Sequence, residues 1–285
     1  YDLSNIFLPD GDSSIEKNKK NSKAHRAFAD ILISKRRQPH RAAVTALEYV
    51  TAFKRFNHTN GQSKSIKNVL ISGSSNGDVV LNINHGTVVR ELSTSHRGSR
   101  ITCIERSPFD PALFLIASNN TNITIWRCDV ALSDQSDVQF EELSALTLGS
   151  RTKRQKAKDE PNRPTLACFS PVDASVVLCT TDQKPPLVAF YCFSTKKFLR
   201  TITLPHWHFA TSLAAYVDLS SSKAYIAAGL NTGKIVLVNY HTEQTADMND
   251  VDVAMEKGNV KALVFCSSQS TLVSTCESNL LCWSF

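Results

Sequence analysis

The sequence predicts an all-β fold of the β-propeller class, and two observations lead to this prediction. The first is a pair of short apolar runs joined by a small polar turn, as in LISGSSNGDVVLNI (70–83), and this pattern recurs four more times before the C-terminus. The second is the spacing, because the second runs of successive pairs lie 44, 64, 48 and 45 residues apart. Four short antiparallel strands that recur every ~40–45 residues form one propeller blade.

Each apolar run holds about five residues rich in Val, Ile, Leu, Phe and Tyr, which is typical of a strand. The turns between paired runs carry residues that tolerate left-handed backbone, such as Asn76-Gly77 and Thr232-Gly233. A third run precedes each pair, and a fourth often follows it. The paired runs begin at 69 and 79, 114 and 123, 176 and 187, 224 and 235, and 271 and 280; the preceding runs begin at 43, 100, 164, 210 and 259; the fourth runs begin at 87, 138 and 198.

These runs define five recognisable blades of a β-propeller within residues 43–285. The 64-residue spacing is explained by a basic insertion at 146–163, which we interpret as an exposed loop. The last blade stops after its third strand, and we interpret residues 1–42 as an N-terminal segment with a basic loop and a ring-closing strand. YDLSNIFL (1–8) or ADILIS (29–34) could supply that strand. A ring of seven blades would require further upstream sequence.

The charge and cysteine content exclude several classes of protein. The net charge of +6 comes from three basic clusters, at 16–26, 34–41 and 150–158, on a nearly neutral remainder. This pattern indicates charged loops rather than the continuous basic face of a dedicated nucleic-acid binder. The eight cysteines include no CxxC pair, and most lie in apolar runs, so we expect reduced core thiols in an intracellular compartment. No apolar run approaches the ~20 residues of a membrane helix, and no secretory signal is recognisable.

Two basic clusters and one aromatic residue supply the candidate partner-binding side chains. They are Arg151, Lys153, Arg154, Lys156, Lys158, Arg36, Arg37 and Trp207. The basic groups could bind acidic or phosphate-rich partners, including tubulin surfaces, or could form solvated loops or an import signal. Trp207 lies in PHWHF (205–209), which we interpret as a blade-joining loop because its histidines have no third metal ligand nearby. We predict no metal, no cofactor and no catalytic residue, since no phosphate loop, nucleophile elbow or HExxH motif is found.

These blades resemble those of WD-repeat propellers. Trp126 in ITIWRC and Trp283 in LLCWSF stand at the third-strand position of the WD signature, and His96 in TSHRGSRIT stands near its Gly-His position. The Asp that follows the Trp in that family is absent here, so the resemblance implies an incomplete side-chain hydrogen-bond network. It also implies a rigid, non-catalytic scaffold whose blade-connecting loops bind other proteins.

A narrower resemblance covers roughly residues 40–285. The order LISGSSNGDVVL, FSPV, STKKFLRT and AAGLNTGKI is similar to the NEDD-type WD family, which targets γ-tubulin ring complexes. The resemblance implies a cytoplasmic protein that recruits these complexes, or their targeting factors, to centrosomes and spindle microtubules in mitosis for microtubule nucleation. Two alternatives remain open: a nuclear WD scaffold that contacts chromatin or RNA-associated complexes through basic loops, and a propeller enzyme with a site around its central channel.

Overall fold

The computed structural model describes most of the predicted propeller. The described residues are 40, 42–54, 66–83, 88–92, 94–130, 138–148, 165–180, 186–204, 208–218, 221–248, 258–266, 271–276 and 279–284. The chain divides into two compact units, Tyr1–Gln38 and Pro39–Phe285, and every described residue belongs to the second. The strand candidates at 1–8 and 29–34 lie outside the described residues, so their ring-closing role stays a prediction.

The described residues form five consecutive blades. Blade 1 contains β1 (Val44–Lys54), β2 (Ile66–Ser74), β3 (Val79–Ile83) and β4 (Val88–Leu92). Blade 2 contains β5 (Ile101–Arg106), β6 (Leu113–Ser118), β7 (Asn122–Val130) and β8 (Val138–Thr147). Blade 3 contains β9 (Ala167–Phe169), β10 (Val176–Thr180), β11 (Leu187–Cys192) and β12 (Lys197–Thr203). Blade 4 contains β13 (Ala210–Asp218), β14 (Lys223–Leu230), β15 (Ile235–Asn239) and β16 (Thr245–Asp247), and the described part of blade 5 contains β17 (Val260–Cys266), β18 (Thr271–Cys276) and β19 (Asn279–Ser284).

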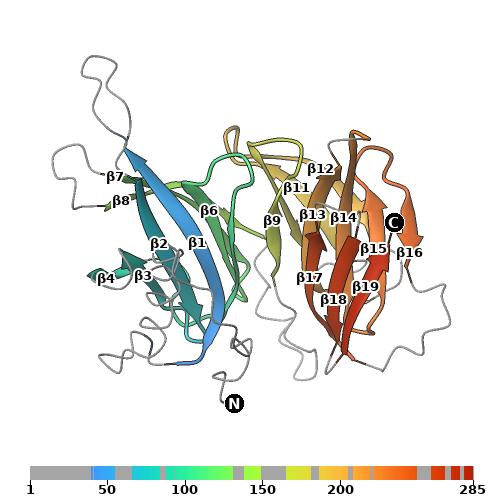
Figure 1. Cartoon of the computed structure of the whole chain (residues 1–285), viewed down its shortest axis with the longest axis horizontal. Helices are drawn as coiled ribbons and strands as arrows, with labels where there is room; N and C mark the ends of the chain where they lie inside the picture. The colour runs from blue at the N-terminus through green and yellow to red at the C-terminus, as the bar shows by residue number, and fades with distance from the viewer. Residues whose placement is uncertain are drawn as a thin grey trace, which may run out of the picture. The chain divides into compact units, whose positions relative to one another are not determined.

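Consecutive strands of each blade pair antiparallel (Figure 1). The first strands of neighbouring blades pack together: β1 contacts β5, β13 contacts β17, and β9 contacts both β5 and β13. A short parallel pairing of β1 with β7 also joins blades 1 and 2 into one eight-stranded sheet. This arrangement confirms the prediction of an all-β propeller with five blades.

The middle strands are apolar on both faces because each inner blade packs between two others. Every residue of β6 is buried. Phe114 and Ile116 of this strand belong to a core shared with blade 1, whereas Leu115 and Ala117 belong to a core shared with blade 3. Since successive side chains of a strand point to opposite faces, a blade between two neighbours requires an uninterrupted apolar run. This requirement explains the short apolar runs that recur in the sequence.

Threonine hydroxyls tie the first strands of neighbouring blades at equivalent positions. Thr45 Oγ1 donates to the carbonyl of Ile101 at 2.7 Å, between blades 1 and 2. Thr211 Oγ1 donates to the carbonyl of Val260 at 2.7 Å, between blades 4 and 5. Thr102 makes the same kind of bond to the backbone that precedes β9. Each bond satisfies a polar group at a blade junction and fixes the register of one blade on the next.

Glycines in the second strands let the next blade approach closely. A Cβ atom added at Gly73 of β2 would lie 2.6 Å from Ile101 Cγ2. One added at Gly229 of β14 would lie 2.5 Å from Val260 Cγ1. Both distances are too short for carbon atoms, so these junctions require a residue without a side chain.

Two elements differ from the sequence prediction. β16 (Thr245–Asp247) forms the fourth strand of blade 4, although no apolar run predicted it. β8 extends to Thr147 and includes the first two residues of the predicted insertion, because Leu146 packs against the core shared with blade 3. Among the described residues, no helix is long and apolar enough to cross a membrane.

Most of the cysteines lie in the core, as predicted from the apolar runs. Cys103 and Cys266 are half-buried and Cys282 is exposed. The five buried cysteines are Cys128, Cys168, Cys179, Cys192 and Cys276. Burial raises the pKa of the Cys179 thiol to about 12, so it packs as a small neutral side chain.

Candidate protein-interaction site

One end of the blades carries the tight turns between second and third strands together with the connections from each blade to the next. In blades 1, 2 and 4, backbone hydrogen bonds tie the turn to the residue that precedes the first strand of the same blade. They run from Ser75 N to Ala43 O at 2.8 Å, from Asn119 N to Arg100 O at 3.0 Å, and from Asn231 N to Phe209 O at 3.1 Å. We call this end the loop face. Its described residues are 75–78, 94–100, 119–121, 208–209 and 231–234.

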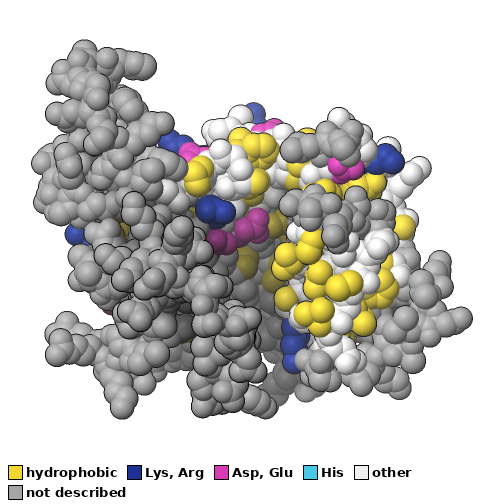
Figure 2. Space-filling view, in the orientation of Figure 1, with side chains coloured by type: hydrophobic (Ala, Val, Ile, Leu, Met, Phe, Trp, Pro, Cys, Tyr) yellow, Lys and Arg dark blue, Asp and Glu magenta, His cyan; other side chains and the backbone are white. Residues whose placement is uncertain are grey.

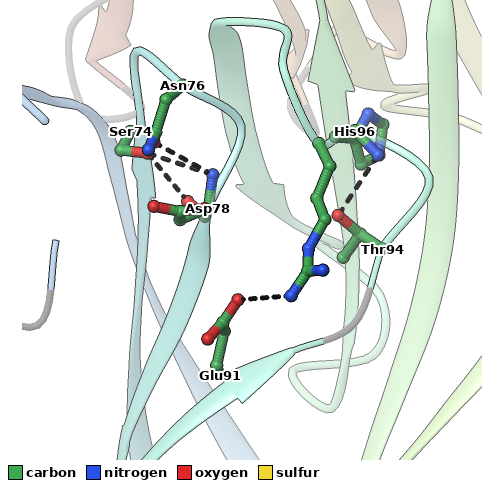
Figure 3. Close-up of polar contacts among 7 residues, drawn as sticks. Ser74, Asn76, Asp78, Glu91, Thr94 and His96 are labelled. Carbon is green, nitrogen blue, oxygen red and sulfur yellow. Dashed lines mark hydrogen bonds and ion pairs between the residues drawn. The ribbon is translucent and has the colours of Figure 1, made fainter. Parts of the chain in front are cut away.

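The turn of blade 1 is held in shape by its own side chains (Figure 3). Ser74 Oγ accepts a hydrogen bond from the Asp78 N–H at 3.0 Å and donates one to Asn76 Oδ1. Gly77 has a φ of 88°, which lies in the left-handed region that favours glycine. The Asn-Gly sequence therefore forms the tight turn that the repeat pattern predicted.

The connection from blade 1 to blade 2 rests on this turn. The Gly98 N–H donates to the Asn76 carbonyl at 2.8 Å, and a Cβ atom at Gly77 would lie only 2.1 Å from His96 O. Arg97 Nη2 lies 3.0 Å from Glu91 Oε1, with the two side chains 72% and 55% exposed. Such an exposed ion pair adds little stability, so the Arg97 guanidinium stays available to a partner.

A chain of hydrogen bonds anchors this connection below its exposed tip. His96 Nε2 lies 2.8 Å from Thr124 Oγ1, which also accepts from Trp126 Nε1 at 2.8 Å. His96 Nδ1 lies 2.6 Å from Ser118 Oγ, which donates to Asn120 Oδ1 at 2.5 Å. Because Thr124 accepts from the indole, its own proton points to Nε2, and we assign the neutral tautomer with hydrogen on Nδ1.

Burial keeps this histidine uncharged. The side chain of His96 is fully buried, and burial lowers its pKa to about 4. The imidazole therefore stays neutral at physiological pH, as the tautomer assignment requires. This uncharged and fully bonded side chain anchors the connection that carries the exposed Arg97 and Arg100.

The WD resemblance implied an incomplete side-chain hydrogen-bond network. This expectation is wrong for blade 2, because the hydroxyl groups of Ser118 and Thr124 complete the network. Outside blade 2 only parts of it form among the described residues. His40 Nε2 lies 2.7 Å from Ser72 Oγ in blade 1, and Trp283 Nε1 donates to Ser274 Oγ at 2.9 Å in blade 5. Sequence reasoning selected His96 but missed its partners, since Ser and Thr are common near turns and give no distinctive spacing.

The eight partner-binding residues predicted from the sequence all lie outside the described residues. They are Arg151, Lys153, Arg154, Lys156, Lys158, Arg36, Arg37 and Trp207. Two of the segments that carry these residues, the basic insertion and PHWHF, each have a described residue at the loop face. Leu148, the third residue of the basic insertion, donates its N–H to Thr121 O at 2.9 Å, and Phe209, which ends the PHWHF segment, accepts from Asn231. The insertion and the PHWHF segment therefore connect blades at this end.

The first strand of blade 2 carries one partly buried carboxyl group, that of Glu105. Glu105 of β5 accepts a hydrogen bond from the Phe169 N–H at 3.2 Å. Burial, with a smaller effect of the Glu48 charge, raises the pKa of Glu105 to about 8. The carboxyl group is therefore largely protonated at neutral pH. Within the part of the chain that the structure describes, no group of three or more His, Cys, Asp and Glu could hold a metal ion.

The repeated four-stranded blades, the His–Ser–Thr–Trp network and the shared loop face define a WD-repeat β-propeller. Proteins of this class are generally non-enzymatic scaffolds that bind other proteins. A family model described as the fourth β-propeller of WDR90 matches residues 29–285. The chain therefore belongs to that family.

Curated relatives of this family are much longer than the chain. It is 30% identical over 209 residues to WD repeat-containing protein 90 of Xenopus tropicalis, covering 70% of this chain and 10% of the relative. It is 27% identical over 187 residues to WD repeat-containing protein 90 of Mus musculus, covering 62% of this chain and 9% of the relative. The chain thus spans about a tenth of the length of these relatives. These matches do not confirm the narrower resemblance to the γ-tubulin-targeting family.

Solved structures share the fold. Chaetomium thermophilum Raptor matches with a TM-score of 0.57 and 13% identity, over 86% of this chain and 20% of that chain. The β-propeller domain of Myceliophteria thermophila Cps50 (Swd1) matches with a TM-score of 0.54 and 15% identity, over 85% of this chain and 65% of that chain. At such low identity the likeness shows the propeller fold alone.

Proposed function

We propose that this propeller docks its protein partner on the loop face, and that the partner is the γ-tubulin ring complex or one of its targeting factors. The observation that carries the docking site is that blade-to-blade connections from three junctions meet the tight turns at one end. Two of these connections contain the basic insertion and Trp207. The sequence resemblance to the γ-tubulin-targeting family supports the choice of partner.

Charge and rigidity both favour this use of the loop face. The exposed Arg97 and Arg100 add positive charge to the same end that carries the basic insertion. A partner with an acidic surface, such as tubulin, is complementary to that charge and would associate faster with it. The hydrogen bonds of the turns and of His96 hold the described loops before binding, which lowers the entropy lost in the complex.

The test is binding of the full-length protein to purified γ-tubulin ring complex. The test variant replaces Arg151, Lys153, Arg154, Lys156 and Lys158 with Glu. We expect its affinity to be roughly tenfold lower or worse, and the wild-type affinity to fall as salt rises. The matched control replaces Lys196, Lys197 and Lys223 with Glu, since these exposed lysines lie at the opposite end of the blades. We expect the control to bind as the wild type does.

Two results would refute parts of this proposal. Absence of binding by the wild-type protein refutes the γ-tubulin partner, and a steep salt-dependent binding to RNA or DNA in its place supports the nuclear alternative. Equal affinity of the loop variant refutes the loop face as the docking site. The same proposal puts the protein in the cytoplasm, at centrosomes and spindle microtubules. Fluorescence imaging of dividing cells checks this, and an exclusively nuclear signal counts against it.

A further inference from the structure

The fourth strand of a blade forms its outer edge. Among the described residues, β4, β8, β12 and β16 each pair on one side only, with the third strand of the same blade. The described side chains of β4, β8 and β16 include no exposed large hydrophobic residue. In β12, however, Phe198 is 53% exposed and Leu199 is 57% exposed. This strand therefore combines an open backbone edge with exposed apolar side chains.

The exposure of β12 has a different cause from the exposure of blade 5. Hydrophobic side chains gather over β17, β18 and β19 (Figure 2), on the last blade, beside which the next element of the ring is expected. Blade 3 has a neighbour on each side, because β9 contacts both β5 of blade 2 and β13 of blade 4. Its inner side chains are buried in the cores shared with these two blades. Closing the ring therefore does not cover the outer edge of β12.

The apolar surface continues from β12 onto a neighbouring turn of the same blade. The Phe193 N–H donates to Ser175 O at 3.0 Å, which ties the turn between β9 and β10 to the hairpin of β11 and β12. Val172 in this turn is 41% exposed. Phe198 packs on Tyr191 of β11, with their ring centroids 5.4 Å apart, so its exposed ring has a fixed support.

Two lysines give this surface a positive charge. Lys196 and Lys197 are exposed at the start of β12, and no described residue forms an ion pair with either of them. Arg200 further along the strand is already paired, since its Nη1 lies 2.9 Å from Glu243 Oε1. A partner segment with carboxylates at the lysine end is therefore complementary to this surface. We call Val172, Lys196, Lys197, Phe198 and Leu199 the rim patch.

The edge of β12 discriminates between strands that could pair with it. A β-bulge at Leu199 interrupts its pairing with β11, and across residues 200–203 the pairing is regular again. Lysines and bulges at a sheet edge discourage pairing with other chains. Carboxylates reverse the effect of the lysines, because the repelled charge becomes an attracted one. The regular part of β12 then remains available as a template for an acidic strand.

We propose that the free edge of β12 binds an extended acidic segment of a partner protein, which adds to blade 3 as a fifth strand. Its aliphatic side chains cover Val172, Phe198 and Leu199, and its carboxylates lie at Lys196 and Lys197. Consecutive strands of each blade pair antiparallel, and antiparallel addition puts these carboxylates at the C-terminal end of the segment. The rim patch lies at the opposite end of the blades from the loop face. Its occupant is therefore a different protein from the ring complex, and the inference stands independently of that partner.

The test is binding of a fluorescent synthetic peptide to the full-length protein, measured by fluorescence anisotropy. The peptide alternates valine and threonine and ends in glutamates at its C-terminus. We expect binding, and we expect Lys196→Glu together with Lys197→Glu to weaken it roughly tenfold or more. The charge-matched control is Arg97→Glu together with Lys234→Glu, since both residues are exposed at the loop face. This control should bind the peptide as the wild type does.

The apolar contact is tested with a second pair of variants. Phe198→Ser together with Leu199→Ser should also weaken peptide binding roughly tenfold, because the aliphatic side chains of the peptide lose their contact surface. Phe109→Ser changes a 48% exposed position between β5 and β6 of blade 2 and should leave the affinity unchanged. Urea unfolding of each variant checks that it remains folded.

Backbone pairing is tested by changing the peptide instead of the protein. A peptide with N-methyl groups on its valines keeps the side chains and loses N–H donors, so we expect it not to bind. Amide hydrogen exchange, followed by mass spectrometry, should slow in β12 when the unmethylated peptide is present.

Four outcomes overturn the proposal. Absence of binding by the wild-type protein, or equal affinity of the Lys196 and Lys197 variant, removes the rim patch as an acidic-peptide site. Equal affinity of the N-methylated peptide shows side-chain contact without strand addition. Equal affinity of a peptide made of glutamate alone shows that charge attraction accounts for the binding without the apolar side chains.

Discussion

At the scale of single residues, His96 connects the loop face to the core. Its pKa is lowered from 6.5 to about 4 by burial, so between these pH values the unfolded chain binds a proton that the folded chain excludes. We therefore predict that the free energy of unfolding falls as pH decreases from 6.5 to 4, by up to about 3 kcal/mol from this residue. Urea unfolding at several pH values in this range measures the effect.

His96→Gln should remove this part of the pH dependence and lower stability at pH 7, because the hydrogen bonds to Ser118 and Thr124 are lost. His208→Gln is the matched control, since His208 is exposed on the same face. A His96→Gln protein that keeps the full wild-type slope between pH 6.5 and 4 would show that another group causes it.

The sequence predicted single residues only where a motif marks them. Trp126, Trp283 and His96 were recognisable from the WD signature, and the structure gives each of them a hydrogen bond. Thr124 was not recognisable, because its role depends on a blade geometry that brings it to His96 from 28 residues away. His40 was missed for the same reason, since its partner Ser72 lies 32 residues along the chain.

At the scale of elements, Arg200 of β12 links blade 3 to blade 4. Its guanidinium lies 4.3 Å from the ring centroid of Phe190, and Nη2 donates to Tyr240 O at 2.5 Å. Nη1 also lies 2.9 Å from Glu243 Oε1. We predict that Arg200→Lys lowers the free energy of unfolding by about 1–2 kcal/mol, because the compact ammonium of lysine lacks the planar fork that lies over the ring and reaches both acceptors. Arg97→Lys, in an exposed ion pair, should change it by less than about 0.5 kcal/mol in the same urea titration.

The junction of blades 4 and 5 depends on Gly229. Gly229→Ala would place its Cβ atom 2.5 Å from Val260 Cγ1, and we predict a loss of about 1–3 kcal/mol from overpacking. Val260→Gly removes both Val260 Cγ1 and Val260 Cβ, which would lie 2.5 and 2.6 Å from the added atom, so the double variant should lose less stability than the two single losses added together. Thermal or urea unfolding of the wild type, the two single variants and the double variant measures the four stabilities that this comparison needs. Strict additivity would mean that the contact does not limit the packing of blade 5.

Most strands were predictable because blade packing demands apolar runs of fixed spacing. β16 was not predicted, since its three residues, TAD, pair along an outer edge that faces solvent and needs no apolar side chain. The sequence also predicted the end of β8 too early, here because an apolar contact was overlooked. Leu146 and Leu148 pack against the core shared with blade 3, and no local pattern in the charged insertion indicates that contact.

At the scale of the whole molecule, the sequence predicted the blade count and the scaffold class but not the surfaces. The loop face follows from topology, because turns and connections from different blades meet only after the strands have paired. Partner identity depends on side chains in the insertion and the PHWHF segment, which carry charge and one aromatic ring but no motif specific to one partner.

The most direct test of the account is cross-linking of the full-length protein, purified from dividing cells, with the cross-linked peptides identified by mass spectrometry. The account predicts that γ-tubulin ring complex subunits cross-link to lysines of the insertion that leaves the loop face, namely Lys153, Lys156 and Lys158. It predicts few cross-links at the opposite end of the blades, at Lys196, Lys197 and Lys223. Partner cross-links concentrated on that opposite end would contradict the loop face as the docking site.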